Sequence, residues 1–414
     1  MRIPRPRRKA LWIGAGALAL VLVAAGILGF GLVRGWFDSG SIEGTTAGFE
    51  PAEAPRGQSD AGSWPEFGFD AQRTRANPAL GLHPPFRRRW SRDAGSLLEF
   101  PPVLAGGRAI VGTNAGLALA IDLTTGRELW SVDLHGRVAS SPAMAGDLVL
   151  FTTKRGGVLA LEAATGHRVW RRALGSASES SPLVVAGSAY LGEISGRVMR
   201  LDLRTSGVRW SAKAAGPVKA SLALSGPNVV VGDYSGRVTA FRRSDGRVVW
   251  RTTSPGERLR GAGRFYAGPA VAYGRVYVGN VNGRVVALDE DTGAIAWVRV
   301  VGGFVYSSAA VSGRRVFVGS YDHHLRALDA VTGRVAWSVD VGERISGSPS
   351  VIGDLVYVST LAPNPADGRT IALDTATGRR VLTFPDGRYS PAVAIRGLLV
   401  LTGVHTLYAL TPRG

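Results

Sequence analysis

The chain of 414 residues contains no cysteine. Disulfide bonds, thiolate metal sites and cysteine nucleophiles are therefore excluded. This absence is compatible with an extracytoplasmic location, because a domain of this length can bury a core large enough to need no disulfide bonds. The sequence also lacks a glycine-rich phosphate loop and an evident Ser/His/Asp arrangement, so no residue is predicted to be catalytic.

Lysine is scarce as well. The formal net charge is +18, but nearly all of the 49 basic residues are arginine, the lysines being Lys9, Lys154, Lys213 and Lys219. One interpretation of this charge is an anionic partner, such as lipid headgroups or an acidic wall polymer. The other interpretation is a compositional bias of the sequence. The abundance of arginine, alanine, valine and glycine favours this second interpretation. No nucleic-acid-binding motif or basic stripe with interleaved aromatic residues is visible, so nucleic acid is not an expected partner.

A repeated unit fills most of the chain. It is clearest from Arg284 to Trp297, where an apolar strand, an Asp-x-x-Thr-Gly turn and a strand ending in tryptophan follow one another. Two more apolar strands precede each unit, the first starting near a Ser-Pro pair. Four short strands in about 40 residues are typical of a propeller blade. The residue that ends the third strand recurs at steps of 40 residues, apart from steps of 47, 45 and 37, at Asp122, Glu162, Asp202, Arg242, Asp289, Asp329, Asp374 and Thr411.

The repeats predict an all-β fold, an eight-bladed β-propeller. Each strand is apolar on both faces, which fits a sheet packed between two neighbours. The closing tryptophans are expected to fill the wedges between blades, at Trp130, Trp170, Trp210, Trp250, Trp297 and Trp337. The eighth unit lacks its last strand, and an orphan strand at residues 86–92, containing Trp90, precedes the first unit. We expect this strand to complete blade eight and close the ring, which removes open sheet edges and predicts a monomer.

The N-terminal region predicts a membrane anchor. Residues 1–9 are basic, and residues 10–33 carry no charge and are long enough to cross a bilayer as a helix. The basic segment predicts an N-terminus in the cytoplasm and a propeller outside it. The alternative is a cleaved secretory signal, but the apolar stretch is long and ends without a good cleavage site. Residues 34–63 predict a flexible linker, and Trp64–Asp70, rich in aromatic residues, predict a segment that packs on the propeller.

The Ala-Leu-Asp-x-x-Thr-Gly-x-x-x-Trp units and the Trp-Pro-x-Phe-Gly-x-Asp segment resemble the pyrroloquinoline-quinone-type β-propeller repeat family over residues 64–414. The resemblance implies the fold, and it allows either quinoprotein dehydrogenases or non-catalytic scaffolds, such as the eight-bladed lipoprotein of outer-membrane β-barrel assembly. Quinoprotein alcohol dehydrogenases carry a vicinal cysteine pair over the cofactor, which this chain lacks. They also need a calcium-binding set of carboxylates on long loops. No cofactor and no metal are therefore expected.

His323 and His324, after Asp322, resemble a metal or acid–base cluster. However, His323 occupies the repeat position that is glycine in most other units, including Gly116 and Gly283. This position is expected to need a positive φ, which histidine tolerates better than most residues. A turn role is therefore favoured over a metal-ligand role.

The breaks in the repeat point to a candidate binding face. Extra residues lie within Thr252–Phe265 and within Leu361–Gly368, and both insertions are expected on the face where the inner strands begin. Loops on a rigid scaffold commonly carry function. The residues three places before the proline, or its equivalent, at the start of each inner strand are expected to ring the channel mouth on this face. The candidates for binding among them are Glu99, Glu179, Lys219, Tyr266, Tyr306 and Arg388. The alternative to a binding face is a rim that contacts only solvent, with loops that have changed in length without acquiring a function.

The sequence thus predicts a membrane-anchored, extracytoplasmic propeller that binds an envelope protein or an anionic polymer. As a non-catalytic scaffold it would serve assembly or maintenance of the cell envelope. The alternative function is a quinoprotein-type dehydrogenase or a sensor of a small ligand.

Overall fold

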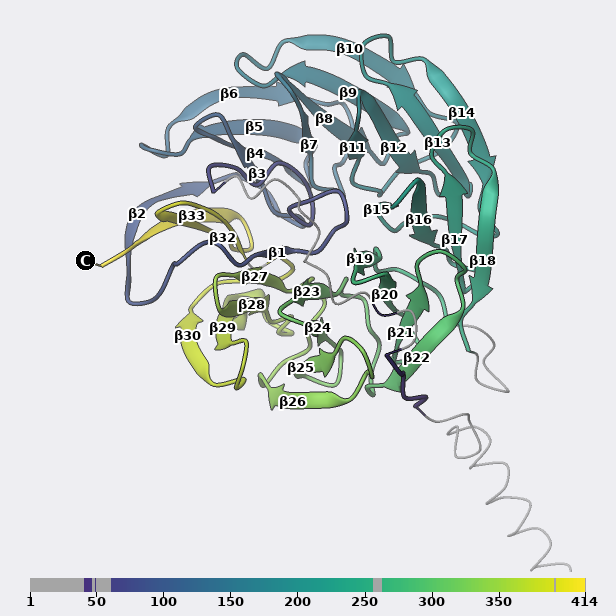
Figure 1. Ribbon diagram of the computed structural model, residues 1–414. Helices are drawn as coiled ribbons and strands as arrows, with labels where there is room; N and C mark the ends of the chain where they lie inside the picture. The colour runs from purple at the N-terminus through teal and green to yellow at the C-terminus, as the bar shows by residue number, and fades with distance from the viewer. Residues whose placement is uncertain (1–40, 47–48, 50–60, 256–262, 391, 414) are drawn as a thin grey trace, which may run out of the picture.

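The computed structural model describes residues 41–46, 49, 61–255, 263–390 and 392–413. These residues form eight sheets arranged as a ring around a central axis (Figure 1). Seven sheets have four strands, and the seventh blade gains a fifth from the short strand β1 (Ala76–Asn77), which pairs in parallel with the inner strand of that blade. The eight-bladed propeller predicted from the repeats is confirmed.

Each blade contributes one strand to each of four concentric positions. The innermost strands of blades 1 to 8 are β3 (Val103–Ala105), β7 (Ala143–Ala145), β11 (Leu183–Val185), β15 (Ala223–Ser225), β19 (Ala270–Ala272), β23 (Ala310–Ser312), β27 (Ser350–Ile352) and β31 (Ala392–Ile395). The second strands are β4 (Arg108–Gly112), β8 (Leu148–Thr153), β12 (Ser188–Gly192), β16 (Asn228–Gly232), β20 (Arg275–Gly279), β24 (Arg315–Gly319), β28 (Leu355–Ser359) and β32 (Leu398–Thr402).

The third strands are β5 (Leu117–Asp122), β9 (Gly157–Glu162), β13 (Arg197–Asp202), β17 (Arg237–Arg242), β21 (Arg284–Asp289), β25 (His324–Asp329), β29 (Thr370–Asp374) and β33 (Thr406–Pro412). The outer strands are β6 (Glu128–Asp133), β10 (Arg168–Ala173), β14 (Val208–Lys213), β18 (Val248–Thr253), β22 (Ile295–Val300), β26 (Val335–Asp340), β30 (Arg380–Phe384) and β2 (Phe86–Asp93). A 3-10 helix, η1 (Pro365–Asp367), lies in the insertion of blade 7. The second strands are almost wholly buried, whereas the outer strands alternate between exposed and buried residues.

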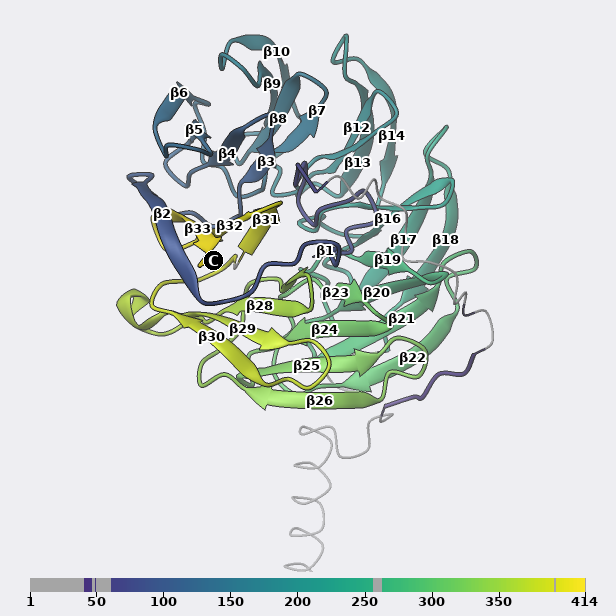
Figure 2. The same cartoon turned by 60° about the vertical axis from the view of Figure 1, so that its left-hand side comes forward.

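The ring closes between the first and last long strands. The outer strand β2 pairs antiparallel with β33, with Trp90 opposite Ala409 and Ser91 opposite Tyr408. Figures 1 and 2 both draw these two strands side by side. The closing strand predicted near residues 86–92 is therefore confirmed, and it covers the edge of β33 that would otherwise be unpaired.

The tryptophans fill the wedges between neighbouring blades, as the repeat predicts. Each indole N–H donates to the carbonyl just after the third strand of the next blade, at 2.8–3.1 Å, in the pairs Trp90–Leu123, Trp130–Ala163, Trp170–Leu203, Trp210–Arg243, Trp250–Glu290, Trp297–Ala330 and Trp337–Thr375. The indole also packs on the glycine of the Asp-x-x-Thr-Gly turn in that blade, as Trp90 does on Gly126. The repeated turn of each blade thus forms the surface on which the tryptophan of the preceding blade packs.

Residues 61–77, which we call the plug, run through the centre of the ring (Figure 2). Backbone hydrogen bonds join the plug to seven blades, through the pairs Ala61–Arg396, Trp64–Leu104, Pro65–Met144, Ala71–Leu224, Gln72–Val271, Thr74–Val311 and Arg75–Val351. The remaining blade, blade 3, is contacted by the guanidinium of Arg73, which donates to the Pro182 carbonyl at 2.9 Å. The sequence predicts that this segment packs on the propeller; the structure places it along the axis.

The plug carries two buried acids and two buried arginines. Arg73 is fully buried and donates to Glu66 at 3.0 Å, to the Phe67 carbonyl and to the Leu222 carbonyl. Burial raises the pKa of Glu66 to about 7 and that of Asp70 to about 6, because the charged carboxylate loses its hydration; Arg73 opposes both shifts. The plug therefore fills the channel and also carries two carboxyl groups whose raised pKa values lie near neutral pH.

Residues 41–46, with residue 49, form a short strap on the outside of the ring. Ile42 exchanges two backbone hydrogen bonds with Val298 of β22, at 2.8 and 2.9 Å. Glu43 forms an ion pair with Arg334 at 2.8 Å, and Phe49 stacks on Tyr273 with ring centroids 5.5 Å apart. This part of the chain differs from the flexible linker expected for residues 34–63. The reason is that β22 still has free outward-pointing backbone groups, which accept a further strand.

Residues 1–40 lie outside the described residues, and so do the basic segment 1–9 and the anchor predicted at 10–33. In the part of the chain from residue 41 onward that the structure describes, no helix is long and apolar enough to cross a membrane.

Candidate binding pocket

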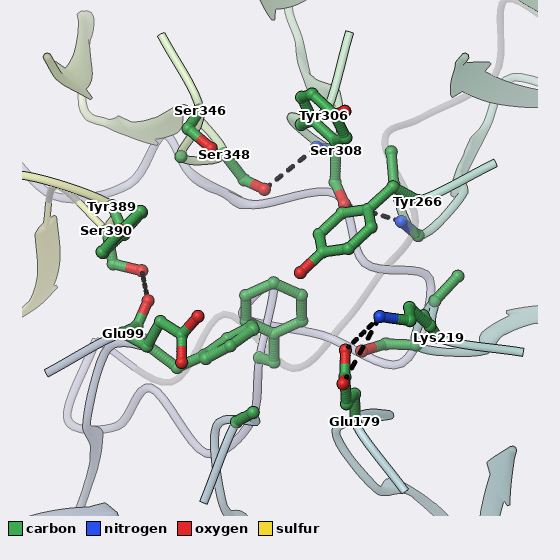
Figure 3. Close-up of a pocket in the computed structure, with 18 of the residues that line it drawn as sticks. Glu99, Glu179, Lys219, Tyr266, Tyr306, Ser308, Ser346, Ser348, Tyr389 and Ser390 are labelled. Atoms are coloured by element: carbon green, nitrogen blue, oxygen red, sulfur yellow. Dashed lines mark hydrogen bonds and ion pairs between the residues drawn. The ribbon is translucent and has the colours of Figure 1, made fainter. Parts of the chain in front are cut away.

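The two faces of the ring differ. One, the turn face, carries the Asp-x-x-Thr-Gly turns; the other, the mouth face, carries the connections from each outer strand to the next inner strand. On the mouth face the channel opens into a cavity of about 240 Å³, which we call the mouth pocket (Figure 3). Its lining includes Phe67, from the plug, so the pocket is blind rather than a through-channel.

Most of the residues predicted to ring the mouth do line this pocket. Glu99, Glu179, Lys219, Tyr266 and Tyr306 all contribute to its wall, each from the start of a different inner strand. The geometry places these side chains together and leaves their binding role a prediction.

Arg388 is the exception among the six candidates, because it is not part of the lining. Its place in the wall is taken by the next residue, Tyr389, and the Arg388 guanidinium lies 5.3 Å from the centroid of the Tyr389 ring. The backbone of Tyr389 lies against Gly347 of blade 7 and leaves no room for a Cβ there. The repeat itself stays in register at this point, because Ser390 precedes β31 by two residues, as Ser348 precedes β27.

The charged residues of the pocket are largely paired. Glu179 is buried and forms ion pairs with Lys154 at 2.7 Å and with Lys219 at 3.3 Å. Glu99, on the other side of the pocket, accepts a 3.0 Å hydrogen bond from the side-chain amide of Asn114. The two lysines neutralise Glu179, so the wall of blades 2 to 4 presents a net positive charge.

Aromatic rings form a continuous arc over blades 4, 5 and 6. Neighbouring centroids along the arc are 4.9–6.3 Å apart, and its members are Tyr234, Tyr266, Tyr306, Phe304 and Tyr321. Lys219 lies over two of these rings, 5.4 Å from the Tyr234 centroid and 5.8 Å from that of Tyr266. The contacts of Tyr306 with Tyr266 and with Phe304 are edge-to-face and the other three are tilted, and together they hold the arc in a defined shape.

Three phenols of this arc, those of Tyr234, Tyr266 and Tyr306, have raised pKa values and stay protonated at neutral pH. Burial raises the pKa of Tyr234 to about 12, and the charge of Glu179 adds to the shift. Burial raises the pKa values of Tyr266 and Tyr306 in the same direction. The arc therefore offers neutral hydroxyl donors and apolar ring edges, which suit an uncharged or apolar group of a ligand.

A collar of serines fixes the pocket wall. The Ser-Pro starts of the inner strands hydrogen-bond from blade to blade, where a backbone N–H donates to the serine hydroxyl of the next blade in the pairs Ser141–Ser181, Ser181–Ser221, Gly268–Ser308 and Ser308–Ser348. Ser390 links blade 8 to blade 1 by donating its hydroxyl to the Glu99 carbonyl at 3.2 Å. Because the collar joins successive blades, the mouth pocket is preformed.

The histidine pair belongs to a turn, as favoured from the sequence. His323 has a φ of 73°, and the Nδ1 of His324 lies 2.8 Å from the backbone carbonyl of Asp322. Gly368 and His405 hold the same repeat position as His323 in the last two units, where a positive φ was also expected. That expectation is wrong there, since Gly368 has a φ of −61° and His405 is not among the residues with positive φ. Among the described residues no group of three His, Cys, Asp or Glu side chains could hold a metal ion.

Sequence reasoning missed several residues of the site. Tyr234 and Tyr321 lie in hairpins between second and third strands, and Phe304 lies in the connection between β22 and β23, two residues before the candidate Tyr306. None of the three occupies the repeat position from which the candidates were chosen. The aromatic character of neighbouring repeat positions in consecutive units was the available signal. Phe67 could not be placed from the repeat, because the plug lies outside it.

The fold and this pocket define a class: an eight-bladed propeller whose channel is closed by its own N-terminal segment and is open on one face. Sequence comparison gives the family. The family described as outer membrane protein assembly factor BamB matches residues 86–222, 209–303 and 299–414, and the chain belongs to this family. A comparison with curated proteins finds no significant match.

Solved structures with the same fold fall into different functional groups. BamB from Moraxella catarrhalis is 18% identical, with a TM-score of 0.67, over 79% of this chain and 99% of that one. Quinohemoprotein alcohol dehydrogenase from Comamonas testosteroni is 16% identical, with a TM-score of 0.74, over 87% and 82%. The computationally designed Ika8 protein is 17% identical, with a TM-score of 0.66, over 77% and 98%. At these identities the likeness concerns the fold alone.

The dehydrogenase relatives raise the question of a calcium-supported quinone cofactor. Calcium takes six to eight oxygen ligands, usually including unpaired carboxylates. In the mouth pocket Glu179 is already neutralised by two lysines, and Glu99 is bonded to Asn114 on the opposite wall. These residues do not fit a calcium–quinone pair.

Proposed function

We propose that the protein is a membrane-anchored, extracytoplasmic scaffold without catalytic activity. Its mouth pocket binds a segment of an envelope protein during assembly or maintenance of the cell envelope. The observation that carries this proposal is the preformed, blind pocket, whose carboxylates are already occupied and whose exposed wall is an aromatic arc. Such a wall suits an apolar anchor side chain from a partner, since tyrosine-rich pockets are frequent sites of binding energy.

The anchor itself rests on the uncharged residues 10–33 and the basic residues before them. Membership of the BamB-described family supports a protein partner in envelope assembly. An anionic polymer is the alternative partner, and the positive wall around Lys154 and Lys219 is the feature that would favour it.

Pull-down of envelope proteins with a double variant tests the proposal. We expect Tyr266→Ala with Tyr306→Ala to lower partner recovery at least tenfold. A matched control is Leu129→Ala, which also removes an exposed apolar side chain, on the outer strand of blade 1 far from the pocket. Arg388→Ala serves as a second comparison, because Arg388 lies beside the pocket without lining it. Equal recovery by all variants, each shown to be folded by circular dichroism, would overturn the assignment of the pocket.

A dehydrogenase is the second candidate, favoured by the fold shared with quinohemoprotein alcohol dehydrogenase. Adding pyrroloquinoline quinone and calcium to the purified protein decides between the two. The scaffold proposal expects neither cofactor absorbance on the protein nor reduction of an acceptor dye.

A further inference from the structure

We infer that the mouth-side rim of blades 5 and 6 rests on an anionic membrane surface, and that the strap holds the ring in this orientation. The inference rests on the proposed membrane anchor. It adds to that proposal which side of the ring faces the lipid. Three independent observations support it: the direction of the strap, the length of chain before it, and the side chains on the rim.

The strap runs across blade 5 from the mouth side to the turn face. The hydroxyl of Ser41 accepts a 3.0 Å hydrogen bond from the amide of Val300, the last residue of β22, before the connection on the mouth face. Ile42 then pairs with Val298, and Phe49 reaches Tyr273 in the hairpin on the turn face. Ser41, the first residue of the strap, therefore lies at the mouth side of blade 5.

The anchor leaves little chain between the membrane and this point. The uncharged stretch ends at Val33, eight residues before Ser41. Eight residues span at most about 28 Å when fully extended. With the proposed anchor, the Val300 end of β22 therefore lies at most about 28 Å from the membrane surface.

The rim at this point carries the side chains that suit a lipid headgroup layer. Phe304, in the connection that follows β22, is 51% exposed, and Val300 is 44% exposed. Arg264 and Arg344 are exposed in the neighbouring connections on the same face. Aromatic residues are favoured at the bilayer interface, and arginines are attracted to anionic headgroups. The opposite rim has Arg137, which carries no aromatic ring, at the repeat position of Phe304, so the aromatic side chain is what distinguishes the two sides.

The strap is firmly held against the blade pair. Gly44 fits so closely that a Cβ there would lie 2.4 Å from the Val331 carbonyl oxygen and 2.8 Å from the indole of Trp297. Glu43 contacts Arg334 at 2.8 Å and Arg299 at 3.8 Å. The strap contacts blades 5 and 6 at the same time. Contacts with two blades fix the direction of the strap relative to the ring, whereas a contact at one point would let it rotate.

Single-cysteine reporters in the full chain test this orientation, because the chain has no cysteine of its own. Phe304→Cys and Arg137→Cys place a bimane fluorophore at equivalent positions on opposite sides of the mouth face. The protein is reconstituted in vesicles of phosphatidylcholine and phosphatidylglycerol that contain a headgroup spin-labelled lipid. We expect the quencher to lower fluorescence at position 304 at least threefold more than at position 137.

Each other outcome contradicts a different part of the argument. If the protein remains with vesicles after an alkaline carbonate wash but both positions are quenched equally, or position 137 more, the orientation is wrong while the anchor stands. If the protein is released by the wash, the anchor is wrong and the orientation fails with it. If quenching at position 304 persists unchanged in vesicles of phosphatidylcholine alone at high salt, the anionic lipid is not part of the contact.

Discussion

Trp297 of blade 5 lies against Gly333 of blade 6 so closely that a Cβ on Gly333 would come within 2.7 Å of the indole ring. Gly333 has a φ of 71°, as most glycines of the Asp-x-x-Thr-Gly turns have positive φ. Glycine at position 333 therefore meets two requirements. It adopts the left-handed backbone conformation, and it leaves room for Trp297 of the neighbouring blade. The contact joins two blades through residues that are far apart in sequence.

The first prediction separates these two requirements. Gly333→Ala should lower the free energy of unfolding by about 1–3 kcal/mol more than Gly313→Ala, because only the former overpacks a ring. Gly313 also has a positive φ, of 55°, but no atom lies within 4 Å of its Cβ position. Denaturant titrations of both variants measure the difference. Equal losses would mean that backbone strain alone selects the glycine.

The second prediction concerns the tryptophans themselves. Trp297→Ala should cost about 3–5 kcal/mol, because a fully buried indole leaves a cavity between two blades. Trp170 is only partly buried, so Trp170→Ala should cost less. Midpoints of urea unfolding at constant slope test this order. A larger loss at Trp170 would contradict the wedge account.

The third prediction follows from the buried acids of the plug. The pKa of Glu66 is raised to about 7 from 4.5, so the folded state binds more protons than the unfolded state between these values. Stability from this group is thus full below about pH 4.5 and is lost as the pH rises through 7. We expect the free energy of unfolding to fall between pH 5 and pH 8, and Glu66→Gln to flatten the fall. A rise over this range would show that the ion pair with Arg73 dominates instead.

The turn aspartates do not obscure that measurement. Hydrogen bonds to Thr125 lower the pKa of Asp122, and hydrogen bonds to Arg209 and Thr205 lower that of Asp202. Their contribution is present above the unfolded value of 3.8 and is lost only in more acidic solution. The window from pH 5 to pH 8 therefore reports on the plug.

The fourth prediction tests the strap by hydrogen exchange. The amide of Val298 donates to Ile42, and that of Val300 donates to Ser41. Gly44→Val cannot be accommodated beside Val331, so the strap should detach and both amides should exchange at least tenfold faster. Amides of the outer strand β14, which has no strap, provide the control. Unchanged exchange at Val298 would show that the strap contributes no protection.

The sequence predicts the repeated part of this fold well and the unrepeated parts poorly. Periodicity located the blades, the wedge tryptophans and the closing strand at Trp90, because each depends on side chains that recur. The plug is held mainly through backbone groups, which carry no residue signal, so only its aromatic residues marked it as ordered. The same reason explains the strap, whose central contact is the backbone pairing of Ile42 with Val298.

The candidate site shows the same division. Five of the six candidates line the mouth pocket, because the repeat fixes where each inner strand begins. Arg388 does not line the pocket although blade 8 stays in register, because an alignment of repeats gives the position of a residue and not the contacts of its side chain. The aromatic arc was missed because its members come from different repeat positions that meet only across blades.

The position of the plug also bears on how the chain is made. Residues 61–77 leave the ribosome before any blade, and β33, which pairs with β2, emerges after all the others. Each newly synthesised sheet can therefore dock on a backbone that already offers its hydrogen-bonding groups, while the circle stays open until the final strand arrives. The segment synthesised first thus serves as a central template for the blades, and the strand synthesised last closes the ring.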